Sequence, residues 1–339
     1  MTQSEIEGGV RLSVLDTAPI VEGSSARQAL HNTVDLARLA DTLGYHRYWV
    51  PEHHSMRGVA SAAPAVLVGR LAEATRSIRV GSGGVLLPNH SPLIVAEQFG
   101  TLEALYPGRI DLGLGRALGG PPRVASVMGR TGQGHRDFAE QLRELLAYFD
   151  EPEPEPGTVT AVPAVGNRPQ PWILGTGTAS AELAGAFGFP YAAAHHLNAD
   201  CIEVLKRYRE TFQPSASTPT PRAIVSVSVI VADSDSRAEW LAGSTRLKIL
   251  SRLKGSRIRL PSPEHAAQVH YTAEERATID LHTRGLIAGG PQAVCQMLDV
   301  LIKQFSPDEI LVTTPVFDPV DRCRSYELLA ESLPLLGTV

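Results

Sequence analysis

The chain has 339 residues, of which 43% are hydrophobic and 20% are charged, and its formal net charge is −5. This length accommodates one large domain or two ordinary ones, with a sizeable buried core. The acidic balance and the lack of a Lys/Arg-rich run argue against nucleic acid as a partner. We also find no apolar stretch near the roughly 20 residues that a membrane-spanning helix needs.

The cysteines and the amino terminus indicate a cellular compartment. Cys201, Cys295 and Cys323 are far apart in the sequence and form no Cys-x-x-Cys pair. They therefore indicate neither a zinc site nor a disulfide framework. Residues 1–9 are polar and lack the apolar core of a secretory signal. We expect a cytoplasmic protein in a reducing environment.

Strand-like and helix-like segments alternate along the chain. Eight β-prone runs are expected as strands, at residues 12–15, 48–50, 78–81, 109–113, 171–174, 190–194, 223–231 and 309–313. Helical patterns are expected at residues 26–43, 63–75, 92–105, 135–149, 180–187, 201–212, 236–253, 291–305 and 320–333. Eight βα units favour a TIM-type (β/α)8 barrel, a single domain over residues 1–339 with its core at about 10–335. The alternative, an open doubly wound sheet, usually has a Gly-rich turn after its first strand, and none follows Leu15.

Two segments interrupt this alternation. Residues 151–157 are acidic and Pro-rich and are expected to form a solvated loop. Residues 255–272 contain Gly255, Pro261 and Pro263 and show no clear period, which predicts an irregular insertion loop. Long irregular segments within a compact domain are usually functional or mobile.

The most informative segment is residues 48–54, with the sequence YWVPEHH. Its apolar part is typical of a buried parallel strand, and Pro51 ends that strand because proline cannot extend a central ladder. Glu52, His53 and His54 therefore lie at the carboxyl end of a strand, where ligands bind in α/β folds. These ionisable groups are candidates for catalysis, and the alternative is a hydrogen-bonded cluster that anchors a loop.

Two further strand ends carry glycines. Residues 81–84 (GSGG) follow the third expected strand and either let a ligand approach the backbone closely or form a flexible turn. Residues 113–116 (GLGR) end the fourth strand. There Arg116 either reaches a phosphate between small neighbours or is a surface arginine over a tight turn.

The best candidate anion site is the segment 175–180 (GTGTAS), between a strand and a helix. Backbone N–H groups at a helix start point outward and carry partial positive charge. Hydroxyl groups add donors at Thr176, Thr178 and Ser180. The Walker pattern GxxxxGK[ST] is absent, so a P-loop NTPase is not favoured.

Two kinds of enzyme fit these strand ends. A metal-dependent hydrolase would use His53 and His54 as ligands, but adjacent strand residues point to opposite faces, and the only other histidine pair is His195–His196. A flavin or phosphorylated-cofactor enzyme would hold its phosphate at Arg116 and residues 177–180. Its ring would then lie across the barrel beside His53.

Four segments in order resemble the bacterial luciferase-like flavin-dependent monooxygenases, namely residues 43–54, 80–88, 107–116 and 174–190. The resemblance covers roughly residues 12–333. It implies a TIM-type barrel that binds FMNH2 delivered by a separate flavin reductase. It further implies that a C4a-(hydro)peroxyflavin inserts one oxygen atom from O2 into a small organic substrate.

The resemblance also assigns roles to residues. It implies that His53 is the catalytic histidine, and we expect Glu52 to support it by orienting the neighbouring imidazoles or polar backbone through hydrogen bonds. Gly83–Gly84 falls where the family often has a non-prolyl cis peptide under the flavin. The residues expected at the cofactor are Ser82, Gly83, Gly84, Arg116, Arg136, Thr176, Gly177, Thr178 and Ser180, and no metal is expected.

The chain departs from the luciferase branch of that family at two places. That branch has Glu-Ser where this chain has Thr176–Gly177, and a reactive cysteine where this chain has Gly115. Residues 255–272 fall where the family has a mobile active-site loop, which would shield the reaction from water.

Two alternatives keep the same fold. One is a deazaflavin (F420)-dependent oxidoreductase, and the other is a non-catalytic flavin-binding protein. Because relatives often dimerise, we expect a homodimer, with the apolar run 60–71 at its interface.

Overall fold

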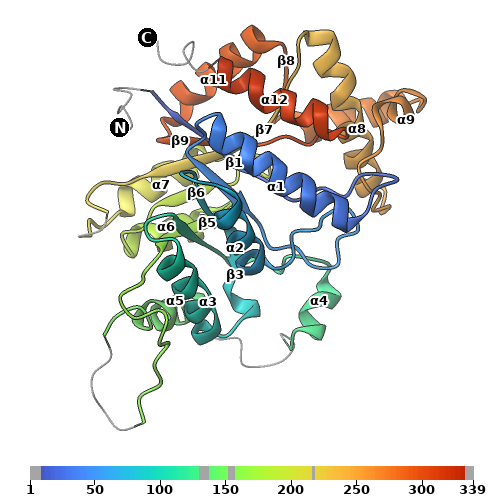
Figure 1. Ribbon diagram of the computed structural model, residues 1–339. Helices are drawn as coiled ribbons and strands as arrows, with labels where there is room; N and C mark the ends of the chain where they lie inside the picture. The colour runs from blue at the N-terminus through green and yellow to red at the C-terminus, as the bar shows by residue number, and fades with distance from the viewer. Residues whose placement is uncertain (1–8, 130–136, 152–156, 216–217, 333–339) are drawn as a thin grey trace.

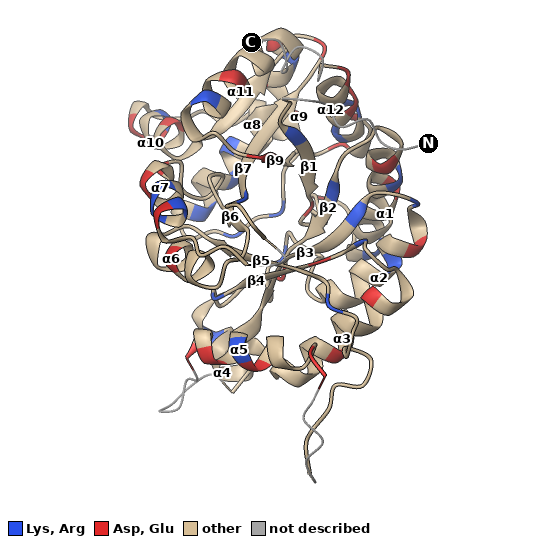
Figure 2. Ribbon diagram, turned by 90° about the vertical axis from the view of Figure 1, so that its left-hand side faces the viewer, with Lys and Arg blue, Asp and Glu red and all other residues tan. Residues whose placement is uncertain are grey.

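The computed structural model describes residues 9–129, 137–151, 157–215 and 218–332 (Figure 1). Parallel strands close into a ring in which β1 pairs with β2, each strand pairs with the next up to β7, and β9 joins β7 back to β1 (Figure 2). This confirms the expected TIM-type barrel. The ring strands are β1 (Arg11–Leu15), β2 (Arg47–Val50), β3 (Arg79–Leu86), β4 (Ile110–Gly115), β5 (Gln170–Gly175), β6 (Tyr191–Ala193), β7 (Ala223–Val231) and β9 (Glu309–Thr313).

Helices cover the outside of the barrel (Figure 1). Those expected from periodicity are α1 (Ala26–Thr42), α2 (Pro64–Ala74), α3 (Pro92–Leu105), α5 (Phe138–Ala147), α6 (Thr178–Ala186), α7 (Ile202–Thr211), α8 (Asp235–Leu253), α11 (Pro291–Phe305) and α12 (Pro319–Glu331). The ends of α1 show why the boundaries fall where they do. Ser25 caps it by accepting from the Gln28 N–H, and Gly44 follows it with a φ of +80°. Among the described helices, none has the length and apolarity that crossing a bilayer requires.

Several elements were not expected from the sequence. They are η1 (Leu87–Asn89), α4 (Pro122–Val127), α9 (Pro263–Ala267), α10 (Ala273–Thr283) and a ninth strand, β8 (Leu286–Gly289). β8 pairs with the distal half of β7 and is not part of the ring. The expectation that residues 255–272 are irregular is wrong over α9, which begins after a cap at Ser262.

The third strand is longer than expected. β3 continues through residues 81–84 to Leu86, so interpreting these glycines as a flexible turn is wrong. A Cβ on Gly81 would lie 2.4 Å from the backbone oxygen of Asp111 on the neighbouring strand. Glycine is therefore required by close strand packing at that position.

Buried charges close the amino end of the barrel. Arg47 forms ion pairs with Asp111 at 2.7 Å and with Glu309 at 2.6 Å. Trp49 donates its indole N–H to Asp111 at 2.9 Å and packs edge-to-face on Trp172. This layer leaves the carboxyl ends of the strands, which we call the barrel mouth, as the place for a ligand.

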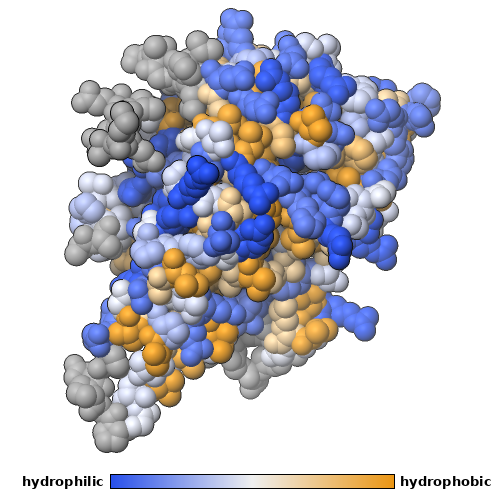
Figure 3. All heavy atoms as spheres, in the orientation of Figure 1, coloured by the Kyte–Doolittle hydropathy of each residue, from blue (hydrophilic) through white to orange (hydrophobic). Residues whose placement is uncertain are grey.

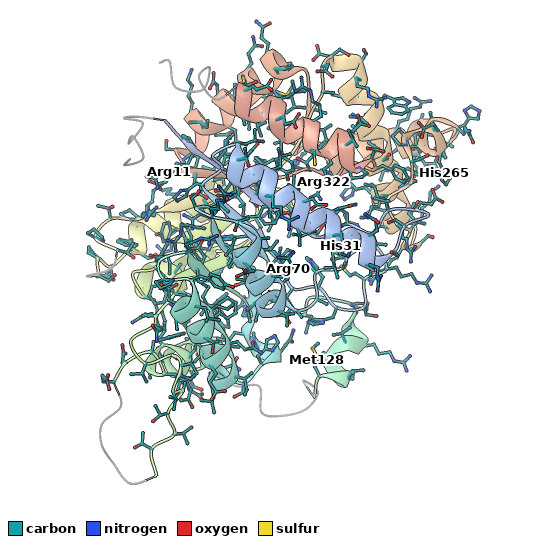
Figure 4. All side chains as sticks on the ribbon, in the orientation of Figure 1. Arg11, His31, Arg70, Met128, His265 and Arg322 are labelled. Carbon is teal, nitrogen blue, oxygen red and sulfur yellow. The ribbon has the colours of Figure 1, made fainter. Side chains whose placement is uncertain are left out.

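A second buried ion pair joins α12 to the segment after β1. Arg322 lies between α12 and α1 (Figure 4), and its guanidinium is 2.7 Å from Asp16. Asp16 also accepts hydrogen bonds from Tyr48 at 2.5 Å and Thr33 at 2.7 Å. These contacts hold β1, β2, α1 and α12 together.

One face of the molecule carries exposed apolar side chains. They gather over the lower half of the view in Figure 3, around the region of α3 and α5 in Figure 1. Val66 on α2 is 75% exposed and Ile94 on α3 is 45% exposed.

Candidate active site

His53 follows β2 at the barrel mouth. Its backbone N–H donates to the carbonyl of Ser61 at 2.9 Å. Its Nδ1 is buried and has no hydrogen-bond partner in the described part of the chain. Burial lowers the pKa of His53, and the charges of His54 and Lys248 lower it further, against the opposing effect of Glu52. The imidazole is therefore neutral at neutral pH, with an unused ring nitrogen.

Glu52 is a buried carboxylate held by several hydrogen bonds. It accepts from His54 at 2.7 Å, His90 at 2.9 Å, Asn89 at 3.1 Å and the Leu86 N–H at 2.9 Å. Burial alone would raise its pKa, but hydrogen bonds from His90, His54 and the Leu86 N–H outweigh burial and lower the pKa to about 2. Glu52 thus orients imidazoles as expected, but those of His54 and His90. No contact within the described residues joins its carboxylate to His53, so a catalytic role for Glu52 stays a prediction.

The expected cis peptide between Gly83 and Gly84 is present in β3. A Cβ on Gly84 would lie 2.6 Å from the carbonyl oxygen of Gly113, and one on Gly83 would lie 3.0 Å from the Cβ of Trp49. Position 84 therefore needs glycine, and position 83 has little space for a larger residue. The hydroxyl of Ser82 donates to the Gly113 carbonyl at 2.9 Å, so that hydroxyl is used within the barrel wall.

The segment between β5 and α6 is open to solvent. Gly177 is the N-cap of α6, and no described side chain caps the N–H groups of the first turn. Thr176 and Thr178 are exposed, and a Cβ on Gly177 would meet no atom of the described chain within 4 Å. Ser180 donates its hydroxyl to the Gly177 carbonyl at 2.8 Å and lies 3.0 Å from the Tyr191 hydroxyl. N–H groups arranged in this way can bind an anion such as a phosphate, and the phosphate site at these residues stays a prediction.

The two expected arginines differ in what the structure shows. Arg116 is exposed directly after β4, and β4 pairs with β5, so it lies on the same side of the mouth as residues 175–180. Over the described ranges it forms no ion pair. Arg136 lies outside the described residues.

Two further residues lie at the barrel mouth that sequence reasoning did not assign. The ring of His196, after β6, is hydrogen-bonded to Ser226 at 2.6 Å, and burial lowers its pKa to about 4, with smaller effects of His195 and His53. The position of His196 directly after a β-strand is a sequence signal that could have identified it. Lys248 lies within α8 and close enough to His53 to affect its pKa. A lysine in the middle of a helix carries no such signal.

These residues fit a flavin or deazaflavin. An uncapped helix start and Arg116 suit a phosphate, and the buried Nδ1 of His53 has no hydrogen-bond partner among the described residues. Where the structure describes the chain, no group of three or more His, Cys, Asp or Glu side chains could hold a metal ion. The metal-hydrolase alternative therefore has no ligand set there.

A profile of the luciferase-like monooxygenases matches residues 10–305. The chain belongs to this family. A luciferase-like monooxygenase of Escherichia coli (strain K12) is 43% identical over 321 residues, covering 94% of this chain and 96% of that protein. The N-acetyl-S-alkylcysteine monooxygenase of Bacillus subtilis (strain 168) is 34% identical over 330 residues, covering 96% and 98% of the two chains. The crystal structure of apo-MsnO8 has a TM-score of 0.85 and 38% identity, and covers 97% of this family member and 100% of that chain.

More distant structures share the fold of this luciferase-like family member. One is the oxygenating constituent of 3,6-diketocamphane monooxygenase in complex with FMN, at 21% identity and a TM-score of 0.73. Another is an F420-dependent secondary alcohol dehydrogenase, at 16% identity and a TM-score of 0.64.

Proposed function

We propose that this protein is an FMNH2-dependent monooxygenase that receives reduced flavin from a separate reductase. It inserts one oxygen atom from O2 into a small organic substrate. One observation carries the proposal: an uncapped helix start after β5 shares one barrel mouth with His53 after β2, whose Nδ1 has no partner among the described residues. In the ring order these strands lie nearly opposite each other, which suits a long cofactor bound across the mouth.

The residues of the chain divide the work of binding and proton transfer. FMNH2 would supply the electrons that activate O2. The N–H groups of residues 177–180, with Arg116, would hold the phosphate, and the ring would lie beside Gly83–Gly84. His53 would hold or move a proton at Nδ1, and its lowered pKa keeps it neutral and able to accept one. Glu52 would position His54 and His90 beneath the site.

FMN is favoured over F420 by the more similar relatives. The E. coli and B. subtilis relatives are both named monooxygenases, whereas the F420-dependent structure is similar in fold alone. The B. subtilis relative is named for N-acetyl-S-alkylcysteine, so a thioether is the first substrate class to test.

The test uses the full chain, FMNH2 and 18O2. The protein is mixed anaerobically with FMNH2 and N-acetyl-S-benzylcysteine, or with members of a panel of thioethers, aldehydes and ketones, and 18O2 is then admitted. We expect one 18O atom in the product by mass spectrometry, and none from FMNH2 without protein. His53→Ala should retain FMN binding and lower turnover by about 10²-fold or more.

Two outcomes would reject the proposal. One is the absence of 18O in the products of every panel member. The other is substrate-dependent oxidation of reduced F420 without oxygen incorporation, which would establish the deazaflavin alternative. Flavin binding without either reaction would indicate the non-catalytic alternative.

A further inference from the structure

Lys248 brings an isolated positive charge to the barrel mouth. Its Nζ lies 3.6 Å from the position that a Cβ on Gly58 would occupy. The same position is 3.6 Å from the Cα of Arg259 and 3.8 Å from the carbonyl oxygen of Ile20. Segments that follow β1, β2 and α8 thus converge around this ammonium group, which is close enough to His53 to lower the pKa of its imidazole.

Within the part of the chain that the structure describes, the ammonium group lacks a counterion. Throughout the described ranges, no carboxylate forms an ion pair with Lys248 and no acceptor hydrogen-bonds to it. Burial lowers the pKa of Lys248, and the charge of Arg252 adds to this effect. By contrast, the fully buried Arg47 and Arg322 are both paired with carboxylates. Lys248 is only partly buried, and a ligand of opposite charge would stabilise its unpaired ammonium group.

The surroundings of Lys248 favour an anion. Arg252 and Arg259 are exposed beside it, and their charge attracts anions to the mouth. The carboxylate of Glu52, in the same loop as Gly58, is already occupied by its own hydrogen-bond donors.

The strand order separates Lys248 from the phosphate loop. Ile20 and Gly58, which surround the ammonium group, follow β1 and β2, whereas residues 175–180 join β5 to α6. In the eight-stranded ring, β1 and β5 lie on opposite sides. A cofactor phosphate held at the start of α6 therefore leaves Lys248 to the second reactant.

We propose that Lys248 binds a carboxylate group of the organic substrate and so directs the rest of that molecule toward His53. The substrate class is thus a small carboxylic acid whose reactive atom lies away from its carboxylate. This inference rests on the proposed function, because it names the substrate of that reaction. Carboxylate binding is nevertheless measurable without turnover.

The test compares acids with their uncharged amides. Isothermal titration calorimetry uses the full chain loaded with oxidised FMN, and the ligands are N-acetyl-S-benzylcysteine, hexanoate and the carboxamide of each. We expect the wild type to bind each acid at least about tenfold more tightly than its amide, as a charge-assisted hydrogen bond implies. Lys248→Met should lose this preference while its amide affinity stays the same, which also shows that the variant folds.

Two further variants sharpen the comparison. Lys248→Arg keeps the charge and should keep part of the preference for acids. Lys303→Met is the matched control, because Lys303 is an exposed lysine in the last turn of α11. It should change acid affinity by less than about threefold.

Three outcomes would overturn the inference. They are equal affinity of the wild type for acid and amide, a preference that survives in Lys248→Met, and no binding by any of the acids. A loss of affinity for FMN but not for riboflavin in Lys248→Met would also overturn it, because Lys248 would then bind the cofactor phosphate. Repeating the titrations without flavin separates this inference from the proposed monooxygenase function. If the protein prefers acids over amides but never inserts oxygen, the result counts against the monooxygenase function and not against carboxylate binding by Lys248.

Discussion

Replacing Glu52 with glutamine tests how far a single carboxylate stabilises the barrel mouth. The Glu52 side chain is buried and accepts hydrogen bonds from His54, His90, Asn89 and the Leu86 N–H. Its pKa falls from an ordinary 4.5 to about 2. Such a shift corresponds to about 3 kcal/mol in favour of the charged form in the folded state.

We therefore expect Glu52→Gln to lower the free energy of unfolding by about 3 kcal/mol at neutral pH. Because the pKa of Glu52 is lowered on folding, this stabilisation is fully present above about pH 4.5 and is lost as the pH falls toward about 2. The difference between wild type and variant should consequently shrink at about pH 3.

Urea denaturation followed by tryptophan fluorescence measures both quantities. The matched control is Glu203→Gln on α7, where the carboxylate is exposed and its ion-pair partner Lys206 is 4.0 Å away. This control should change stability by less than about 0.5 kcal/mol. The reasoning would be refuted if Glu52→Gln lowered the free energy of unfolding by less than about 1 kcal/mol at neutral pH. It would also be refuted if the decrease were the same at neutral pH and at about pH 3.

Three other predictions concern the site and the assembly. Because burial lowers the pKa of His53, the acidic limb of kcat/KM should lie below pH 6.5, and a limb at or above 6.5 would contradict a role for its neutral form. Gly177→Asp should weaken FMN binding at least about tenfold without weakening riboflavin binding, because aspartate suits the N-cap but repels a phosphate. Fluorescence titrations measure both affinities, and an equal loss of affinity for FMN and riboflavin would contradict this prediction. We further propose a homodimer through α2, on which Val66 is 75% exposed. Val66→Arg should give a monomer by light scattering while its free energy of unfolding stays the same. A dimer that persists in this variant would count against that interface.

Much of the fold could be predicted from the sequence. The eight β-prone runs became the eight ring strands, because buried parallel strands are continuous apolar segments that can be identified locally. β8 and the short helices α4 and α9 were missed, since elements of four to six residues carry too little periodicity. The predicted third strand was shorter than β3 because glycine disfavours strands, although close packing on β4 requires glycine there.

The candidate site was predictable in part. Strand ends and glycine patterns led to residues 52–54 and to the start of α6, because these are local features. The family resemblance singled out His53 and the Gly83–Gly84 peptide. The sequence could not show that Glu52 holds His90 or that His196 and Lys248 reach the same mouth. These contacts join residues from separate βα units.

The sequence by itself determined the barrel and the ends of the strands where chemistry takes place, because periodicity and proline act over a few neighbouring residues. The tertiary structure alone decided which ionisable groups have partners. The carboxylate of Glu52 accepts hydrogen bonds from residues 34 to 38 positions away. Among the described residues, Nδ1 of His53 has no hydrogen-bond partner and Lys248 has no counterion. Pairing of buried charges depends on the directions that side chains take in space, and spacing along the chain does not specify those directions.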